Sequence, residues 1–165
     1  MSEILAIVNE KDEVIGQKTR EEIHKSDFWH RGVHAIISDK NNKILLQKRS
    51  ASKDKFPCCF DLSVSGHVDL NESYDEAIVR ELKEELNIVA EPLCINCISS
   101  ISLDTTLKNF ASPLKIKQNY FLKKLVKLRM DYGENDNMIS VVYELNYNGN
   151  IEFDKEEIED IYFRN

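Results

Sequence analysis

Residues Gly66 to Ile88 read GHVDLNESYDEAIVRELKEELNI, and this stretch predicts a helix that carries three glutamates close together. A helix turns by about 100° per residue, so Glu81, Glu84 and Glu85 share one face. At neutral pH their carboxylates repel one another by roughly 0.2–0.5 kcal/mol per pair. A divalent cation removes this repulsion, and oxygen ligands of this kind suit Mg²⁺ or Mn²⁺. The stretch therefore predicts a metal site on a helix.

The sequence also marks where this helix begins and ends. Ser73 followed by Glu76 has the form of a capping box, which predicts a helix start at that point. Asn87 stands where the chain must leave the helix, and Asn is the best non-glycine residue for a left-handed C-cap. Before the helix, Gly66 gives a turn at which backbone can approach a ligand. The face away from the glutamates is apolar and is expected to pack on a sheet. Its members are Ile78, Val79, Leu82 and Leu86.

A run of charges is more often a solvated helix face than a metal site. That interpretation explains neither Gly66 at the head of the stretch nor the strict spacing of Arg80-Glu81 and Glu84-Glu85. The spacing therefore favours the metal site.

The stretch resembles the Nudix box, G-x5-E-x7-R-E-U-x-E-E-x-G-U, in which U is an aliphatic residue. The matching residues are Gly66, Glu72, Arg80, Glu81, Leu82, Glu84, Glu85 and Ile88, while Asn87 stands where the family has Gly. The resemblance implies a Nudix-type α/β/α sandwich with a mixed β-sheet, which we expect to form one domain over residues 1–165. It also implies roles for the box residues. Glu81, Glu84 and Glu85 would be catalytic metal ligands together with Gly66, with Glu81 a candidate base, and Glu72 and Arg80 would support them.

Composition and charge narrow the class of protein further. The chain has 165 residues, enough for one domain with a core, and a net charge of −7. Such an acidic chain is poorly suited to nonspecific binding of a nucleic-acid backbone. No run reaches the ~20 apolar residues that span a bilayer, and the start, MSEILAIVNEKDEV, lacks a basic leader. We therefore expect a cytoplasmic protein that neither binds nucleic acid nor inserts in a membrane.

The four cysteines fit a reduced setting. Cys94 and Cys97 form a C-x2-C pair, and Cys58 and Cys59 are adjacent, so four thiolates could hold a zinc ion. Adjacent cysteines fit poorly around one tetrahedral ion, however, and Cys94 lies in an apolar run that is typical of a buried strand. Small core residues are the simpler interpretation.

Alternation and turn residues predict the remaining elements. We expect a hairpin over residues 3–16 and a short helix over residues 19–25. Strands are expected at residues 32–38, 43–47, 92–102, 121–131 and 139–146, and a short helix or helical turn at residues 156–162, while residues 62–68 lead into the box. Strands on both sides of one central helix predict an α/β sandwich.

The segment before the box, WHRGVHAIISDKNNKILLQKRSASKDKFPCCFDLSVSGHV, resembles one branch of the family, which contains isopentenyl-diphosphate isomerase and its hydrolase-like relatives. The shared features are HR before the first core strand, LLQKRS, K-x-x-FP, and GH at the box. By this resemblance His30 and His67 match positions at which the isomerase holds its metal, and His24 matches a third. His34 is expected to be an inward or cross-strand residue without a catalytic role.

Basic residues after a buried strand are candidate contacts for the substrate. Arg49 offers a planar fork for phosphate oxygens and Lys48 a point charge, and surface charge at a strand end is the alternative for both. Lys53 and Lys55 are weaker candidates of the same kind. Together with His30 and His67, Arg49 and Lys48 form the expected substrate-binding set.

Two positions separate isomerase from hydrolase. In the isomerase, protons are moved by a Cys two residues before the GH histidine and by a Glu on the strand after the box. Ser65 stands at the first position, and Met138 stands at the second, with Glu134 and Asp136 nearby. A hydroxyl is a far weaker acid than a thiol, so the isomerase chemistry is disfavoured.

The sequence therefore predicts a hydrolase that uses Mg²⁺ or Mn²⁺ to cleave a diphosphate linkage in a nucleoside diphosphate derivative or related small molecule. Glu134 or Asp136 is the expected outer carboxylate from beyond the box. The alternatives are isopentenyl-diphosphate isomerase and a non-catalytic nucleotide-binding module, and a homodimer is left open.

Overall fold

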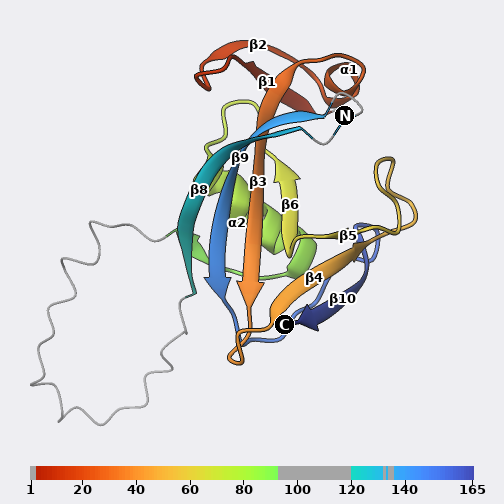
Figure 1. The fold of residues 1–165 in the computed structure, drawn as a ribbon, viewed down its shortest axis with the longest axis vertical. Helices are drawn as coiled ribbons and strands as arrows, with labels where there is room; N and C mark the ends of the chain where they lie inside the picture. The colour runs from red at the N-terminus through yellow and green to blue at the C-terminus, as the bar shows by residue number, and fades with distance from the viewer. Residues whose placement is uncertain (1–2, 93–119, 132, 134–135) are drawn as a thin grey trace, which may run out of the picture.

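The computed structural model describes residues 3–92, 120–131, 133 and 136–165, which are built around an eight-stranded mixed β-sheet (Figure 1). A separate two-stranded hairpin lies at one end of the sheet (Figure 1). The elements are β1 (Ile4–Val8), β2 (Val14–Thr19), α1 (Arg20–His24), β3 (Trp29–Ser38), β4 (Ile44–Arg49), β5 (Phe60–Asp61), β6 (Val64–His67), α2 (Tyr74–Leu86), β7 (Glu91–Pro92), β8 (Phe121–Asp131), β9 (Asn137–Asn146) and β10 (Ile158–Arg164).

Strand β3 is the centre of the large sheet. It runs parallel to β9 along its whole length and antiparallel to β6 over residues 32–35. Strand β4 pairs with β3 only at Ser38 and Ile44, and then continues beside β5 and β10. Because β4 leaves β3 after a single pair, the sheet opens between β4–β5 and β6, and the candidate site lies at this opening.

The two faces of β3 have different characters, since alternate residues of a strand point to opposite sides. Val33, Ala35 and Ile37 are fully buried in the main core. The apolar face of α2 packs there, as its spacing predicts, and Ile78, Leu82 and Leu86 are fully buried, with Val79 packed at the margin. The other face of β3 carries His30, Gly32 and His34, and this polar face forms part of the site.

Both predicted caps of α2 are confirmed. Ser73 and Glu76 form a reciprocal capping box at the helix start. Asn87 is left-handed, with φ 52° and ψ 31°, and its N–H donates to the carbonyls of Leu82 and Lys83. Asn87 therefore supplies the backbone conformation for which the family uses Gly.

The N-terminal hairpin and short helix are also confirmed. Strands β1 and β2 pair antiparallel, and Thr19 with Glu22 caps α1. Leu5, Ile7 and Ile23 form a small core of their own beneath this helix. This packing brings the start of the chain and α1 to the edge of the site.

The prediction of a helix or helical turn at residues 156–162 is wrong, because a short turn there leads into strand β10. Residues 158–164 pair antiparallel with β4, and the hydrogen bonds and packing of that edge outweigh the helix preference of the acidic residues. The predicted strand at residues 92–102 lies, beyond its first residue, outside the described part of the chain, as do Cys94 and Cys97. Cys58 and Cys59 are exposed, which contradicts their interpretation as core residues.

The mixed sheet of the predicted fold is confirmed. Within the described ranges, α2 is the long helix and α1 has five residues. No helix there is long and apolar enough to cross a membrane.

Candidate active site

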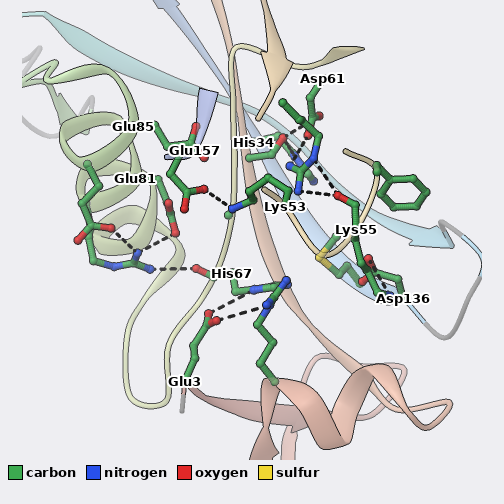
Figure 2. A pocket seen from close by; sticks show the side chains of 18 of the residues that line it. Glu3, His34, Lys53, Lys55, Asp61, His67, Glu81, Glu85, Asp136 and Glu157 are labelled. Atoms are coloured by element: carbon green, nitrogen blue, oxygen red, sulfur yellow. Dashed lines mark hydrogen bonds and ion pairs between the residues drawn. The ribbon is translucent and has the colours of Figure 1, made fainter. Parts of the chain in front are cut away.

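A cavity of about 650 Å³ opens between α2, β6 and the loop that follows β4 (Figure 2). It brings together most of the residues that the sequence singled out. Those in its lining are His24, His34, Arg49, Lys53, Lys55, Ser65, Gly66, His67, Arg80, Glu81, Glu84, Glu85, Asp136 and Met138. The lining is completed by Glu3, Arg20, Phe56, Asp61, Asp69, Asp154 and Glu157.

Gly66 is required by the position of Glu81. A Cβ atom at residue 66 would lie 2.1 Å from Glu81 Cδ and 2.2 Å from Glu81 Oε1, far inside contact distance. Strand β6 and helix α2 can therefore hold the Glu81 carboxylate against the strand only when residue 66 has no side chain. The glycine at the head of the box thus makes room for one of its glutamates.

Arg80 connects the carboxylates of the box. Its guanidinium donates to both oxygens of Glu72, with both N–O distances 2.9 Å, and to Glu81 Oε1 at 2.7 Å. It also donates to Glu84 Oε2 at 3.1 Å and to the carbonyl of His67 at 3.0 Å. This geometry agrees with a supporting role for Glu72 and Arg80, since one cation orders three acidic side chains and fixes them to β6.

The glutamates of the box differ in environment. Burial raises the pKa of Glu81 to about 7, although Arg80 beside it acts in the opposite direction. Burial raises the pKa of Glu85 well above its ordinary value, and the negative charges of Glu81 and Glu157 add to the effect. Gln47 Nε2 donates to Glu85 Oε2 at 3.4 Å. Glu84 is more exposed and lies at the rim. Two buried carboxylates with raised pKa values, facing a cavity, form a site that a cation would stabilise.

A second group of potential ligands lies beside the same cavity, which His24, His67 and Asp136 line, while His30 is fully buried and is not part of the lining. His24, His30, His67 and Asp136 each offer one atom, and these atoms lie within 4.8 Å of one another. His24 Nε2, His30 Nε2 and Asp136 Oδ1 are buried without a hydrogen-bond partner. Buried polar atoms are rarely left unsatisfied, so this donor set fits a divalent cation. The structure thus brings together all three histidines that the resemblance singled out, and we name them with Asp136 the histidine cluster.

Neighbouring residues keep the histidine cluster suited to a metal. Burial lowers the pKa of His24 to about 4 and the pKa of His30 to about 3, so both rings are neutral at pH 7 and keep a lone pair. His67 Nδ1 pairs with Glu3 Oε1 at 3.2 Å, an arrangement that commonly orients a ligating histidine. Lys55 Nζ lies 3.7 Å from Asp136 Oδ2.

The basic residues divide into two groups. Arg49, Lys53 and Lys55 line the cavity opposite α2, where Lys53 pairs with Glu157 and Arg49 with Asp61. Lys48 does not line it, because its Nζ points to Glu159 Oε1 at 2.7 Å. Of the two strand-end cations proposed for phosphate binding, the structure brings only Arg49 to the cavity.

Some lining residues were not found by sequence reasoning. Asp61 and Glu157 come from β5 and from the turn before β10, and Glu3 comes from the start of the chain. None belongs to a motif with a fixed spacing, so only the fold reveals them.

Asp136 was expected as an outer carboxylate of the box, but it joins the histidine cluster. Glu134 lies outside the described residues. A usable signal was His34 between the apolar residues Val33 and Ala35 on β3, which marks a polar sheet face opposite the core.

Comparison with known proteins agrees with this geometry. The NUDIX domain family model matches residues 28–164. A Nudix hydrolase of Nostoc sp. is 39% identical over 131 residues, which cover 79% of this chain and 71% of that protein. The chain spans less of other relatives, such as 45% of a Nudix hydrolase of Clostridium acetobutylicum that is 41% identical over 93 residues.

Among solved structures, DR0079 of Deinococcus radiodurans superposes with a TM-score of 0.70 at 27% identity, covering 98% of this chain and 83% of that one. Both walls of the cavity lie within the matched fold. The glutamates that α2 presents beside Gly66, and the family match that runs from β3 to β10, establish that this chain belongs to the Nudix hydrolase family.

Proposed function

We propose that the protein hydrolyses a diphosphate linkage in a nucleoside diphosphate derivative or a related small molecule, with Mg²⁺ or Mn²⁺ bound at the box. The observation that carries this proposal is the division of one cavity into an acidic and a basic wall. Glu81 and Glu85 lie on α2, while Lys53 and Lys55 face them from the loop after β4 (Figure 2). Arg49, at the end of β4, lines the same side of the cavity. Cations bound by the acidic wall and side chains of the basic wall can hold the same phosphate chain from two sides.

The residues have separate tasks in this proposal. Glu81, Glu84, Glu85 and the Gly66 backbone hold the divalent cation, which when bound neutralises phosphate charge and activates water. Glu72 and Arg80 keep the box carboxylates in place through the guanidinium contacts. The Arg49 guanidinium donates to the carbonyl of Lys55 and to Asp61, and its remaining N–H groups are available to phosphate oxygens. His30 and His67 act through the histidine cluster, which we propose as a further divalent-cation site. Because the lining residues extend from Glu3 to Glu157, we propose one functional domain over residues 1–165.

The test combines a substrate panel with one charge-removing variant. Nucleotide sugars, dinucleoside polyphosphates, NADH, ADP-ribose and prenyl diphosphates are incubated with protein and Mg²⁺, and the products are identified by chromatography. Glu85→Gln is expected to lower Mg²⁺ affinity in calorimetry by at least tenfold and to abolish most turnover, with unchanged circular dichroism. Glu76→Gln is the matched control, because it removes a charge from the same helix while Gln still completes the capping box. Equal Mg²⁺ affinity of wild type and Glu85→Gln would contradict the metal assignment.

The isomerase alternative is favoured by one observation, the histidine cluster at the resembling positions. It is opposed by Ser65 and Met138, which both line the cavity and which, by the resemblance, stand where the isomerase carries its proton-transfer groups. Neither side chain is a carboxylic acid or a thiol. We therefore propose hydrolysis rather than alkene isomerisation as the reaction of this cavity.

A further inference from the structure

A buried histidine in the cavity wall takes no part in the proposed metal sites. His34 is 3% exposed, and each of its ring nitrogens lies beside a serine hydroxyl. Nδ1 is 2.9 Å from Ser65 Oγ on β6, and Nε2 is 3.2 Å from Ser140 Oγ on β9. These hydrogen bonds join side chains of three neighbouring strands, β6, β3 and β9, on the face of the sheet opposite the apolar core.

The donor and the acceptor of each hydrogen bond in this series follow from Asp61, the residue at its end. Ser65 Oγ donates to Asp61 Oδ1 at 3.1 Å. The Asp61 carboxylate pairs with Arg49 at 3.1 Å and accepts the N–H of Leu62 at 2.7 Å. An ionised carboxylate can only accept hydrogen bonds, so the single proton of Ser65 points to Asp61.

The tautomer of His34 is then determined. Because the Ser65 proton is directed at Asp61, the contact between Ser65 Oγ and His34 must use a hydrogen on Nδ1. Nε2 carries the lone pair and accepts the hydroxyl of Ser140. Burial lowers the pKa of His34, which agrees with a neutral ring holding one proton.

This arrangement leaves the Ser65 hydroxyl with one unused hydrogen-bond position. A serine hydroxyl donates one hydrogen bond and accepts two, and Ser65 Oγ already donates to Asp61 and accepts from His34. The position that remains on Ser65 Oγ is a hydrogen-bond acceptor, and Ser65 lines the same cavity as Glu81 and Glu85. An ionised phosphate oxygen is itself an acceptor and cannot donate to this position, whereas a neutral O–H group can.

We propose that His34 and Asp61 hold the Ser65 hydroxyl as a hydrogen-bond acceptor for the water molecule that hydrolysis consumes. The inference rests on the proposed function and assigns to His34 and Asp61 the task of positioning residues, with Ser65 the group that contacts the water. Two fixed neighbours prevent the hydroxyl from rotating, so the water meets an oriented partner rather than one that must reorganise.

The first arm of the test is spectroscopic and needs no substrate. In ¹⁵N NMR of the full chain at pH 7.5, a value chosen as about one unit above the ordinary histidine pKa, His34 is expected to show a protonated Nδ1 and an unprotonated Nε2. Ser65→Thr keeps a hydroxyl and should preserve this pattern, while Ser65→Ala should lose it, because Nδ1 no longer has its acceptor. A protonated Nε2, or a doubly protonated ring, in the wild type would overturn the proposed direction.

The second arm is kinetic and uses the panel member that the wild type cleaves fastest. Ser65→Ala is expected to lower kcat on the order of 10²-fold, with KM changed less than about threefold, and Ser65→Thr should recover most of the loss. Mg²⁺ affinity in calorimetry should be unchanged in both variants, which separates this role from that of the box. A rise in KM at constant kcat would instead assign Ser65 to a substrate hydroxyl and overturn the water role.

The two arms also separate the inference from the function on which it rests. If no panel member is cleaved, the proposed function and the water role fail together, while the NMR pattern still decides whether His34 and Asp61 orient Ser65. If hydrolysis is found and Ser65→Ala cleaves at the wild-type rate, the proposed function stands and only the role of Ser65 is refuted.

Discussion

Gly66→Ala offers a direct test of the contact between β6 and α2. The new Cβ would lie 2.1 Å from Glu81 Cδ, and ordinary contact begins at 3.4 Å, so the Glu81 side chain must retreat by about 1.3 Å. Because Glu81 Oε1 accepts a hydrogen bond from Arg80, this movement also disturbs the guanidinium network. Misplacing a reacting group by about 1 Å can cost on the order of 10²-fold in rate.

We therefore expect Gly66→Ala to lower kcat on the order of 10²-fold and the free energy of unfolding by about 1–3 kcal/mol, the usual range for overpacking. Steady-state kinetics with the best panel substrate and urea unfolding measure the two quantities. Gly16→Ala is the control, because its Cβ would be 3.9 Å from Ile7 Cδ1, an ordinary contact.

A double-mutant cycle shows whether the effect passes through Glu81. In a Glu81→Ala background the clash no longer exists, so Gly66→Ala should cause little further loss of activity. Wild-type turnover by Gly66→Ala, or a full additional loss in the Glu81→Ala background, would refute the assignment of Gly66 as space for the Glu81 carboxylate.

Three further predictions concern the helix cap, the pH dependence and the reaction class. Asn87→Val should destabilise the fold by about 1–2 kcal/mol in urea unfolding, because a β-branched residue is strained at φ 52°, while Asn87→Gly should be neutral or mildly stabilising. The folded-state pKa of Glu81 is raised from 4.5 to about 7, so its ionisation costs stability as pH rises through that window. Without metal, Glu81→Gln should therefore exceed the wild type in stability by roughly 1–3 kcal/mol at pH 8 and match it at pH 4. Finally, NMR of isopentenyl diphosphate incubated with the protein should show no appreciable dimethylallyl diphosphate. By the resemblance to the isomerase, Ser65 and Met138 stand in place of groups each worth roughly 10²–10⁴ in rate, and rapid alkene migration would contradict the proposed hydrolysis.

The sequence predicted those features that depend on short-range spacing. Glu81, Glu84 and Glu85 recur at helical intervals, and the caps at Ser73 and Asn87 satisfy backbone groups within a few residues of themselves. Local hydrogen bonds and side-chain periodicity depend on residues close in the sequence, so they can be predicted without knowledge of the fold. Prediction from local sequence failed at residues 156–162, because β4, the strand with which most of them pair, is about a hundred residues away in the sequence.

Only the tertiary structure decided which distant groups share the cavity. Asp136 joined the histidines rather than the box, Lys48 turned to Glu159, and Glu157 came to face Glu85 from the turn before β10. These outcomes depend on strand register and on the point where β4 leaves β3, and a shift of one residue would send each strand side chain to the opposite face. The sequence by itself predicted a metal site on a glutamate-bearing helix, whereas the packing of distant strands brought together the histidine cluster, the basic wall and the hydrogen bonds of Ser65, because those contacts join residues that no local pattern connects.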